Sequence, residues 1–258
     1  METEQDYDTL LTLSTEIGVR LLTSGAEIYR VEESIQRLFS AYGADGSVFV
    51  IPSCIIASLA TPEGHSATRI RRVWDHGTDI QRLEAYNNLC RALCEQRPPL
   101  SKAKAQLALV EARHKTYRYG IRILGYFGGT GAFSLFFGGT WRDGLCAGLC
   151  GAAIGLCLTL MTWLRANAFF QTIAGGFVSG LLAVLLTALG LGQNPDLIII
   201  GALMALVPGM VFTNAMRDIM AGDLIAGITK TAEALLLGTA IALGTGFALA
   251  LTRGLLGG

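Results

Sequence analysis

Polar or ionisable side chains interrupt the otherwise apolar C-terminal part of the chain at Asn214, Arg217, Asp218, Lys230 and Glu233. A charged side chain inside a bilayer costs about 2.5 to 3.5 kcal/mol, so one that is kept there needs a partner or a function. Asn214 and Asp218 share one helix face, and Lys230 and Glu233 lie about one turn apart. A carboxylate could carry a proton or bind an ammonium group, and a cation could bind a carboxylate. We therefore predict a substrate or ion pathway here, with ion pairing at a membrane surface as the alternative.

Pro208 and Gly209 predict a break in the helix that precedes these residues. Proline has no N–H to donate, so Pro208 would free the carbonyl of Met204 about halfway along an apolar run that begins at Leu197. Transporters use unpaired backbone at such a depth to bind substrates, although a simple proline kink is the alternative. Gln171, in another apolar run, could contact the substrate or cap a neighbouring backbone.

Glycine pairs spaced four residues apart recur through the apolar part of the chain. This small-xxx-small spacing lets helix backbones approach closely in a membrane. We therefore predict a role in helix packing, with lining of a pore as the alternative. The pairs are Gly125 and Gly129, Gly144 and Gly148, Gly151 and Gly155, and Gly176 and Gly180.

The sequence has no pattern that indicates a metal, a cofactor or an enzyme active site. None of the six cysteines forms a CxxC pair or a Cys/His arrangement with zinc spacing, and no GxSxG, P-loop or HExxH motif is present. Asp75, His76 and Asp79 could bind a metal, but Asp79 more simply caps the following helix. No basic stripe interleaved with aromatic residues occurs, so no nucleic-acid partner is expected.

The two halves of the chain that position these residues differ in composition. Of the 20 Lys and Arg residues, 15 lie within 1–122, as do 15 of the 20 Asp and Glu residues, whereas 26 of the 32 glycines lie within 120–258. A solvated domain followed by helices packed in lipid explains both distributions. We therefore expect a cytoplasmic domain over 1–116 and a membrane domain over 117–258.

The membrane domain is predicted to be an α-helical bundle of five transmembrane helices. A helix needs about 20 apolar residues to cross the ~30 Å hydrocarbon core. Lys and Arg gather at the start of the first run and at the ends of the second and fourth, and cationic loops stay in the cytoplasm. We therefore predict a membrane protein with its N-terminus in the cytoplasm and its C-terminus outside. The expected spans are about 119–140, 144–164, 168–192, 196–217 and 224–252.

The N-terminal domain is predicted to be a small soluble α+β domain with the element order ααβββαα. Apolar residues recur at helical spacing near its start, and Ser24 and Glu27 have the spacing of a capping box for the second helix. Three segments rich in β-formers follow, with a hairpin turn over 62–64. The expected strands are 47–51, 54–60 and 67–74, and the expected last two helices are about 79–96 and 101–116.

Two stretches of the sequence resemble the threonine/serine exporter (ThrE) superfamily, and within it the split, YjjP-type members. The first is GVRLLTSGAEIYRVEESIQRL (18–38), continued by RRVWDHGTDIQRL (71–83), and the second is VPGMVFTNAMRDIMAGDLIAG (207–227). The likeness covers nearly the whole chain. The residues that match family patterns are Ser24, Gly25, Ala26 and Glu27 in the first stretch and Pro208, Gly209, Asn214, Ala215, Asp218 and Gly222 in the second.

The resemblance implies an inner-membrane exporter of threonine and serine or, as the split type favours, of succinate and related dicarboxylates, driven by the membrane potential or a proton gradient. By the same resemblance the chain is a first half that needs a small membrane subunit of the YjjB type. Self-association of the five helices into a homo-oligomer is the alternative. No cofactor is implied. Two alternatives stay open: a membrane-anchored hydrolase, and a ligand-sensing domain coupled to a channel-like bundle.

Overall fold

The computed structural model describes residues 4–61, 66–74, 77–113 and 117–256, which form two compact units. The first unit combines Met1–Lys115 with Met210–Thr231, and the second combines Thr116–Gly209 with Ala232–Gly258. The sequence predicts a single membrane domain over 117–258. In the structure, the segment 210–231 instead clusters with the N-terminal part of the chain.

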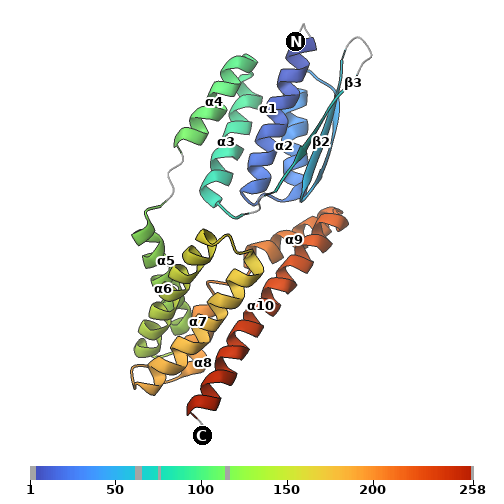
Figure 1. Ribbon diagram of the computed structural model, residues 1–258. Coiled ribbons are helices and arrows are strands. Elements are labelled where there is room, and N and C mark those ends of the chain that lie inside the picture. The colour runs from blue at the N-terminus through green and yellow to red at the C-terminus, as the bar shows by residue number, and fades with distance from the viewer. Residues whose placement is uncertain (1–3, 62–65, 75–76, 114–116, 257–258) are drawn as a thin grey trace. The chain divides into compact units, whose positions relative to one another are not determined.

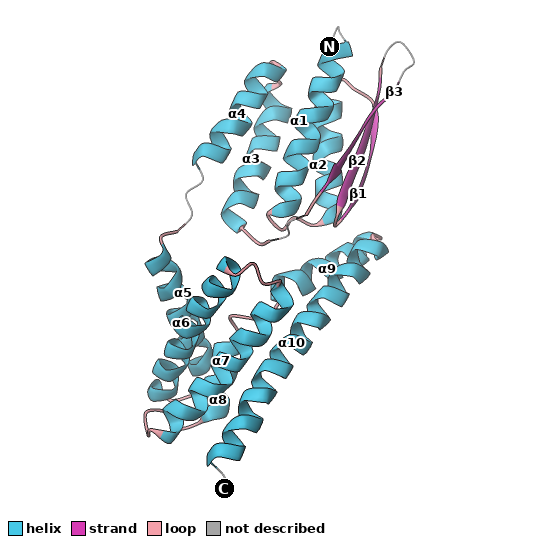
Figure 2. Ribbon diagram, in the orientation of Figure 1, coloured by secondary structure: helices cyan, strands magenta, loops and turns pink. Residues whose placement is uncertain are grey.

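The first unit contains a three-stranded antiparallel sheet with the strand order β1-β2-β3 (Figure 2). The predicted succession of two helices, three strands and two helices is observed, and the predicted hairpin turn over 62–64 lies outside the described residues. Helix α9 and the first turns of α10 belong to the same unit. Its elements are α1 (Glu4–Thr23), α2 (Ile28–Ala41), β1 (Gly46–Ile51), β2 (Cys54–Ala60), β3 (Ser66–Arg72), α3 (Ile80–Gln96), α4 (Leu100–Arg113), α9 (Gly209–Ala221) and the start of α10 (Leu224–Leu256).

One face of the sheet holds the core of the first unit. Side chains alternate along a strand, so Ile55, Ala57 and Leu59 of β2 are buried together. Helix α1 contacts β2 and β3, and helix α2 contacts β1, which places both helices on this face (Figure 1). Ile56 and Ile70, which point the other way, are exposed.

Helix α2 buries one stripe and exposes the others. Ile28, Val31, Ile35 and Leu38 recur at intervals of three and four residues and are fully buried. Each contributes about 1.5 to 3 kcal/mol of hydrophobic stabilisation. The helix ends where Gly43 takes a φ of +73°, a left-handed conformation that glycine adopts without strain.

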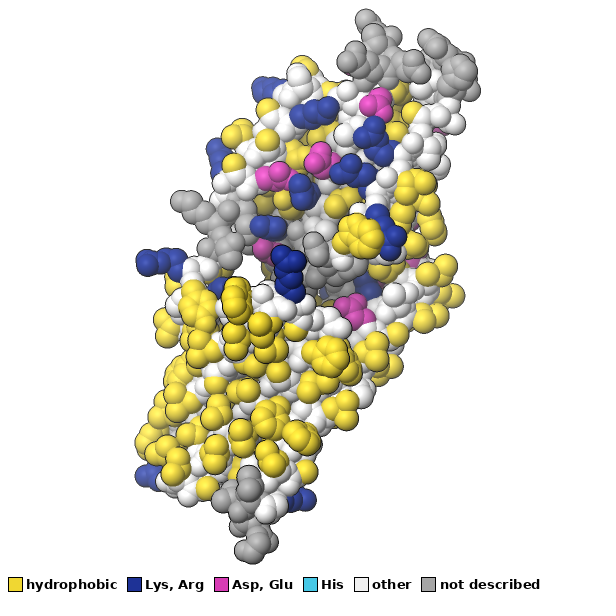
Figure 3. Space-filling model, viewed as in Figure 1, with side chains coloured by type: hydrophobic (Ala, Val, Ile, Leu, Met, Phe, Trp, Pro, Cys, Tyr) yellow, Lys and Arg dark blue, Asp and Glu magenta, His cyan; other side chains and the backbone are white. Residues whose placement is uncertain are grey.

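The described part of the second unit is helical. Three helices of the described chain, α6, α7 and α10 over Leu224–Gly254, are long and apolar enough to cross a membrane. Hydrophobic side chains cover the visible face of this unit (Figure 3). Its elements are α5 (Tyr119–Phe136), α6 (Trp141–Trp163), α7 (Ala168–Ala188), α8 (Pro195–Leu203) and the part of α10 beyond Thr231.

The predicted count of five spans is not confirmed. Helix α5, the predicted first span, has 18 residues and includes Arg122 and five glycines. The predicted fourth span, 196–217, is two helices, because α8 has nine residues, which reach about 14 Å, and α9 begins only at Gly209. Pro208 accounts for the break, since it donates no backbone hydrogen bond and disfavours a helical conformation in the residue before it.

Six of the eight predicted packing glycines lie where helices approach closely. A Cβ added at Gly148 would lie 2.9 Å from an aromatic ring of α5, and one added at Gly180 would lie 2.9 Å from the Cβ of Ala248 in α10. Gly125 and Gly129 do not pack in this way, because no described atom comes within 4 Å of a Cβ added there. Spacing alone does not distinguish the two groups. The other close positions are Gly144, Gly151, Gly155 and Gly176.

Candidate functional site

The turn between α1 and α2 carries the family-like motif and does not form the predicted capping box. The N–H and the hydroxyl of Ser24 both donate to the carbonyl of Arg20, so Ser24 closes α1 rather than opening α2. Gly25 then takes a φ of +96°, and Ala26 is buried. Glu27 is the N-cap of α2, but its side chain accepts no bond from the helix. The capping-box prediction is therefore wrong, because the chain reverses between its two members.

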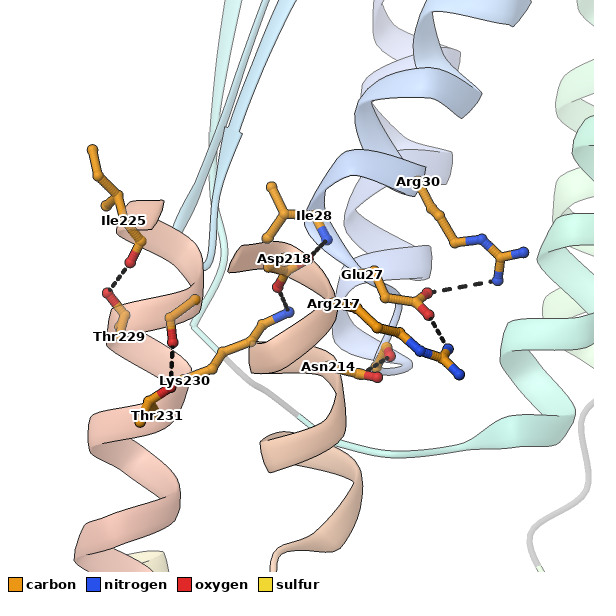
Figure 4. A network of polar contacts seen from close by, with 12 residues as sticks. Glu27, Ile28, Arg30, Asn214, Arg217, Asp218, Ile225, Thr229, Lys230 and Thr231 are labelled. Carbon is orange, nitrogen blue, oxygen red and sulfur yellow. Dashed lines mark hydrogen bonds and ion pairs between the residues drawn. The ribbon is translucent and has the colours of Figure 1, made fainter. Parts of the chain in front are cut away.

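Helix α9 supplies partners to this turn. Arg217 and Asp218 lie three and four positions after Asn214, so the three side chains share one helix face. The amide of Asn214 donates to the carbonyl of Gly25 (Nδ2···O 2.9 Å), and the guanidinium of Arg217 donates to the carboxylate of Glu27 (Nη1···Oε1 2.6 Å; Figure 4). The structure thus brings together two predicted motifs that lie about 190 residues apart in the sequence.

Asp218 lies at the centre of this contact and is fully buried. One carboxylate oxygen accepts the N–H of Ile28, the first residue of α2 (3.0 Å), and the other accepts from the Nζ of Lys230 (2.7 Å). The first N–H groups of a helix have no partner inside it, and a negative charge there is favoured by the helix dipole. Asp218 therefore caps α2 from a distant part of the chain. We call this site the cap cluster; it consists of Gly25, Glu27, Ile28, Asn214, Arg217, Asp218 and Lys230.

Burial makes the cap cluster a tightly held ion network. The side chains of Glu27 and Lys230 are 5% and 12% exposed, whereas that of Arg217 is 57% exposed. Burial acts to raise the pKa of Glu27, but hydrogen bonds from its own N–H and from Arg217, together with the charge of Arg30, lower the pKa below its ordinary value. Glu27 is therefore held ionised. Losing one partner of a buried ion pair costs about 3 to 5 kcal/mol, which applies to the buried pair of Asp218 and Lys230, whereas solvent screens the half-exposed Arg217 and reduces its contribution.

Two neighbouring carboxyl groups have pKa values above their ordinary values, in contrast to Glu27. Burial raises the pKa of Asp223, in the turn between α9 and α10, and the charge of Asp218 raises it further, while Lys230 lowers it. Burial also raises the pKa of Glu32, although its carboxylate accepts the N–H of Val50 (2.7 Å). These two groups take up a proton more readily than Glu27 does.

The other predicted pathway residues do not join the cap cluster. Glu233, one turn beyond Lys230 on α10, is exposed. Pro208 and Gly209 lie at the break between α8 and α9. Gln171 donates from its Nε2 to a backbone carbonyl of the preceding loop (2.7 Å), which is the capping alternative.

The described residues contain no group of three His, Cys, Asp or Glu side chains that could hold a metal ion. Asp79 caps α3 by accepting the N–H of Arg82 (3.0 Å). Asp75 and His76 lie outside the described residues. The groups of the cap cluster form ion pairs and hydrogen bonds.

Asp143 is a buried carboxylate for which the sequence suggested no role. One oxygen accepts the N–H groups of Gln193 (2.7 Å) and Asn194 (3.0 Å), and the other accepts from the N–H and hydroxyl of Thr140. Thr140 and Asp143 form a capping box for α6. The spacing of these two residues ahead of an apolar helix is a signal that could have found the cap. The bonds to the segment 50 residues away have no local signal.

Comparison with known proteins gives matches over nearly the whole chain. The ThrE family model, described as "Putative threonine/serine exporter", matches residues 12–252. The "Probable threonine/serine exporter" of Mycobacterium tuberculosis is 23% identical over 237 residues, which cover 91% of this chain and 45% of that protein. The "Threonine/serine exporter" of Corynebacterium glutamicum is 23% identical over 251 residues, which cover 95% and 51%. The chain spans about half the length of these curated relatives. No solved structure matches it.

The region matched by the family model contains every residue of the cap cluster. Both relatives are named as exporters, and neither is named as an enzyme. The three apolar helices of the described chain agree with a place in a membrane. The chain is therefore a membrane protein that belongs to the threonine/serine exporter family.

Proposed function

We propose that the chain is part of a membrane exporter of small polar metabolites and that the cap cluster controls its transport cycle. The observation that supports this most directly is the pair of bonds from α9 to the start of α2, from Arg217 to Glu27 and from Asp218 to Ile28. They connect a family-like turn to Lys230, at the start of an apolar helix. Such a network can be bonded or released, and a transporter needs two states.

Threonine and serine are the substrates that we propose for this chain. Both relatives carry these names, whereas export of succinate and related dicarboxylates rests on the resemblance to split members alone. The two classes need different energy sources. A dianion that leaves a negative cytoplasm gains about 2.3 kcal/mol per charge per 100 mV, or about 4.6 kcal/mol in all, whereas a zwitterion gains nothing. Concentrative export of threonine therefore needs a coupled proton or ion.

Asp218 is the carboxylate that we propose to couple proton movement to opening. In its ionised form it holds both the N–H of Ile28 and the ammonium of Lys230. Protonation would remove the charge that holds Lys230 and would weaken both bonds. The released Lys230 could then bind the carboxylate of a substrate. Glu233 is the second candidate for carrying a proton.

We further propose that transport needs additional membrane helices. The matches cover 45% and 51% of the two relatives, so each relative contains a further part outside the match. A small membrane subunit of the YjjB type, or a second copy of this chain, would supply it. Efflux measured with the purified chain alone, and again with the small subunit, separates these two forms of assembly.

Our proposal places the protein in the inner (plasma) membrane with a cytoplasmic N-terminus and an external C-terminus. The distribution of Lys and Arg over the loops supports this orientation. Reporter fusions at each terminus test it. A cytoplasmic signal from a C-terminal fusion would contradict it.

Efflux from proteoliposomes tests the proposed function. Vesicles loaded with threonine, serine or succinate would be given a membrane potential without a pH gradient, and then a pH gradient. We expect threonine and serine efflux that requires the pH gradient and is lost in Asp218→Asn and Arg217→Gln. Arg82→Gln, which changes an exposed arginine of α3, is the matched control.

Two outcomes would change the proposal. Succinate efflux driven by the potential alone, without threonine or serine movement, would move the substrate to the dicarboxylates. Efflux of all three compounds no faster than from empty vesicles, with the small subunit present, would contradict an exporter.

A further inference from the structure

Helices α2 and α3 of the first unit line a small pocket of about 160 Å³. The residues from α2 are Arg30, Glu33, Ser34 and Arg37. They are separated by three, one and three positions, so they form a single stripe along the helix. This stripe lies beside the buried apolar one, and helix geometry holds its side chains together.

Helix α3 contributes a stripe with the same spacing, formed by Asn87, Cys90, Arg91 and Cys94. The two helices are in contact, and residues of both stripes line the pocket. Asn87 and, from α2, Ser34 add uncharged hydrogen-bond donors to the charged groups. The pocket is therefore built from two regular helices.

Three guanidinium groups and one carboxylate line the pocket, which leaves an excess of two positive charges. Arg37 pairs with Glu33 (Nη2···Oε1 2.6 Å), and Arg30 lies 3.6 Å from a carboxylate oxygen of Glu27. Arg91 has no ion pair within the described part of the chain. Its charge is available to a ligand.

The two thiols of the pocket do not offset this charge. Burial raises the pKa of the Cys90 thiol to about 12, and the neighbouring Cys94 contributes to the shift. Burial also raises the pKa of Cys94. Both thiols are therefore neutral near pH 7, and the pocket keeps its positive excess.

We propose that this pocket binds a small anion that carries a carboxylate or phosphate group. The planar fork of arginine donates to two oxygens of such a group at once. A volume of about 160 Å³ lies well below the roughly 300 to 1,000 Å³ of sites for drug-sized ligands, so the ligand has few heavy atoms. The transport function proposed above does not involve this pocket.

Arg30, which lines the pocket, also contacts Glu27 of the cap cluster (Figure 4). Its guanidinium lies near one oxygen of Glu27, at 3.6 Å, while the other oxygen accepts from Arg217 at 2.6 Å. A bound anion and Glu27 therefore compete for the same cation. By linkage, the state of Glu27 changes the affinity for the anion, and the anion changes the bonding of Glu27.

Isothermal titration of the full chain in lipid nanodiscs tests the pocket with inorganic phosphate and, separately, with succinate. We expect saturable binding of at least one anion and a loss of about tenfold in affinity in Arg91→Gln, the usual effect of removing a charge-assisted hydrogen bond. Glu33→Gln removes the only carboxylate that lines the pocket within the described chain. It should tighten binding, which misfolding would not do.

Controls and contrary outcomes follow from the same titration. Arg82→Gln changes an arginine of α3 outside this pocket and should bind like the parent chain. Tighter binding of phosphate than of succinate would identify phosphate as the recognised group, and the reverse would identify a carboxylate. No saturable binding of either anion, or equal affinities in the parent chain and Arg91→Gln, would overturn the site.

Glu27→Gln tests the sharing of Arg30. Without the competing carboxylate, the half-exposed Arg30 is freed for the ligand, so we expect anion binding to tighten by about threefold. This readout measures binding alone and does not depend on transport. An unchanged affinity in Glu27→Gln would overturn the link between the pocket and the cap cluster.

Discussion

The cap cluster and the glycine contacts of the second unit hold helices together by opposite means. In the cap cluster, Asp218 pairs with Lys230 (Oδ2···Nζ 2.7 Å) and Glu27 pairs with Arg217 (Oε1···Nη1 2.6 Å), and both carboxylates are largely buried. Between α5 and α6, the backbone at Gly151 approaches Tyr126 without any charge. Close apolar contacts add up from many small terms, whereas a buried ion pair loses its stabilising effect when either partner is removed.

This difference indicates where the protein can be switched. One proton or one anion can alter an ion network, because it changes the charge of a single member. A glycine contact has no comparable group, so it resists such changes and keeps the helices in place. We therefore expect variants of the cap cluster to respond to pH and partner charges, and variants of the glycine contacts to respond only to side-chain volume.

Removing Asp218 should have the largest effect. Asp218→Ala leaves Lys230 buried without a partner and the N–H of Ile28 uncapped, so the free energy of unfolding of the first unit should fall by about 3 to 5 kcal/mol. Denaturant unfolding of the purified protein measures it. The double variant Asp218→Ala/Lys230→Met should recover part of the loss, since no unpaired charge remains. If it recovers nothing, the ion pair is not the source of the stability.

Gly151→Ala should have the next largest effect, in the second unit. The added Cβ would meet the Thr130 side chain and lie 2.7 Å from the backbone oxygen of Tyr126, so we expect a loss of about 1 to 3 kcal/mol. Gly129→Ala is the matched control, because it faces open space and alanine favours a helix by up to about 1 kcal/mol. Thermal unfolding in detergent compares the two. Equal shifts would contradict the packing interpretation.

Glu27→Gln should lower stability by about 1 kcal/mol near pH 7, because the half-exposed Arg217 is screened by solvent. The pKa of Glu27 in the folded chain lies below its ordinary value of 4.5. Its contribution to stability is therefore present above pH 4.5 and is lost as the pH falls through the folded pKa. Unfolding measured across this range should show the difference between the parent chain and Glu27→Gln shrinking in acid. A difference independent of pH would speak against the ion pair.

Ser24→Ala should have the smallest effect. Its hydroxyl only adds a second bond to the carbonyl of Arg20 at the end of α1, so we expect a loss below about 0.5 kcal/mol. An N-cap serine would contribute about 1 kcal/mol. Unfolding of this variant next to Asp218→Ala therefore shows which residue caps α2.

The local patterns of the sequence were sufficient for most elements. Periodic apolar residues predicted α2, segments rich in β-formers predicted the three strands, and long apolar runs predicted α6, α7 and α10. These signals are local, because the periodicity of a helix or a strand can be recognised within a short stretch of sequence. Hydropathy predicted one span over 196–217, because an average over this window does not register the break at Pro208.

Only the tertiary structure decided the partners of the site residues. The sequence identified Glu27, Arg217 and Asp218 as candidates. It predicted, however, that Glu27 forms a capping box with Ser24 and that Asp218 belongs to a pathway in the membrane domain. The bond from Asp218 to the N–H of Ile28 joins residues 190 positions apart, and no local spacing encodes such a contact. The contact forms because the first N–H of α2 and the buried ammonium of Lys230 both need a negative partner, and the carboxylate of Asp218 serves both.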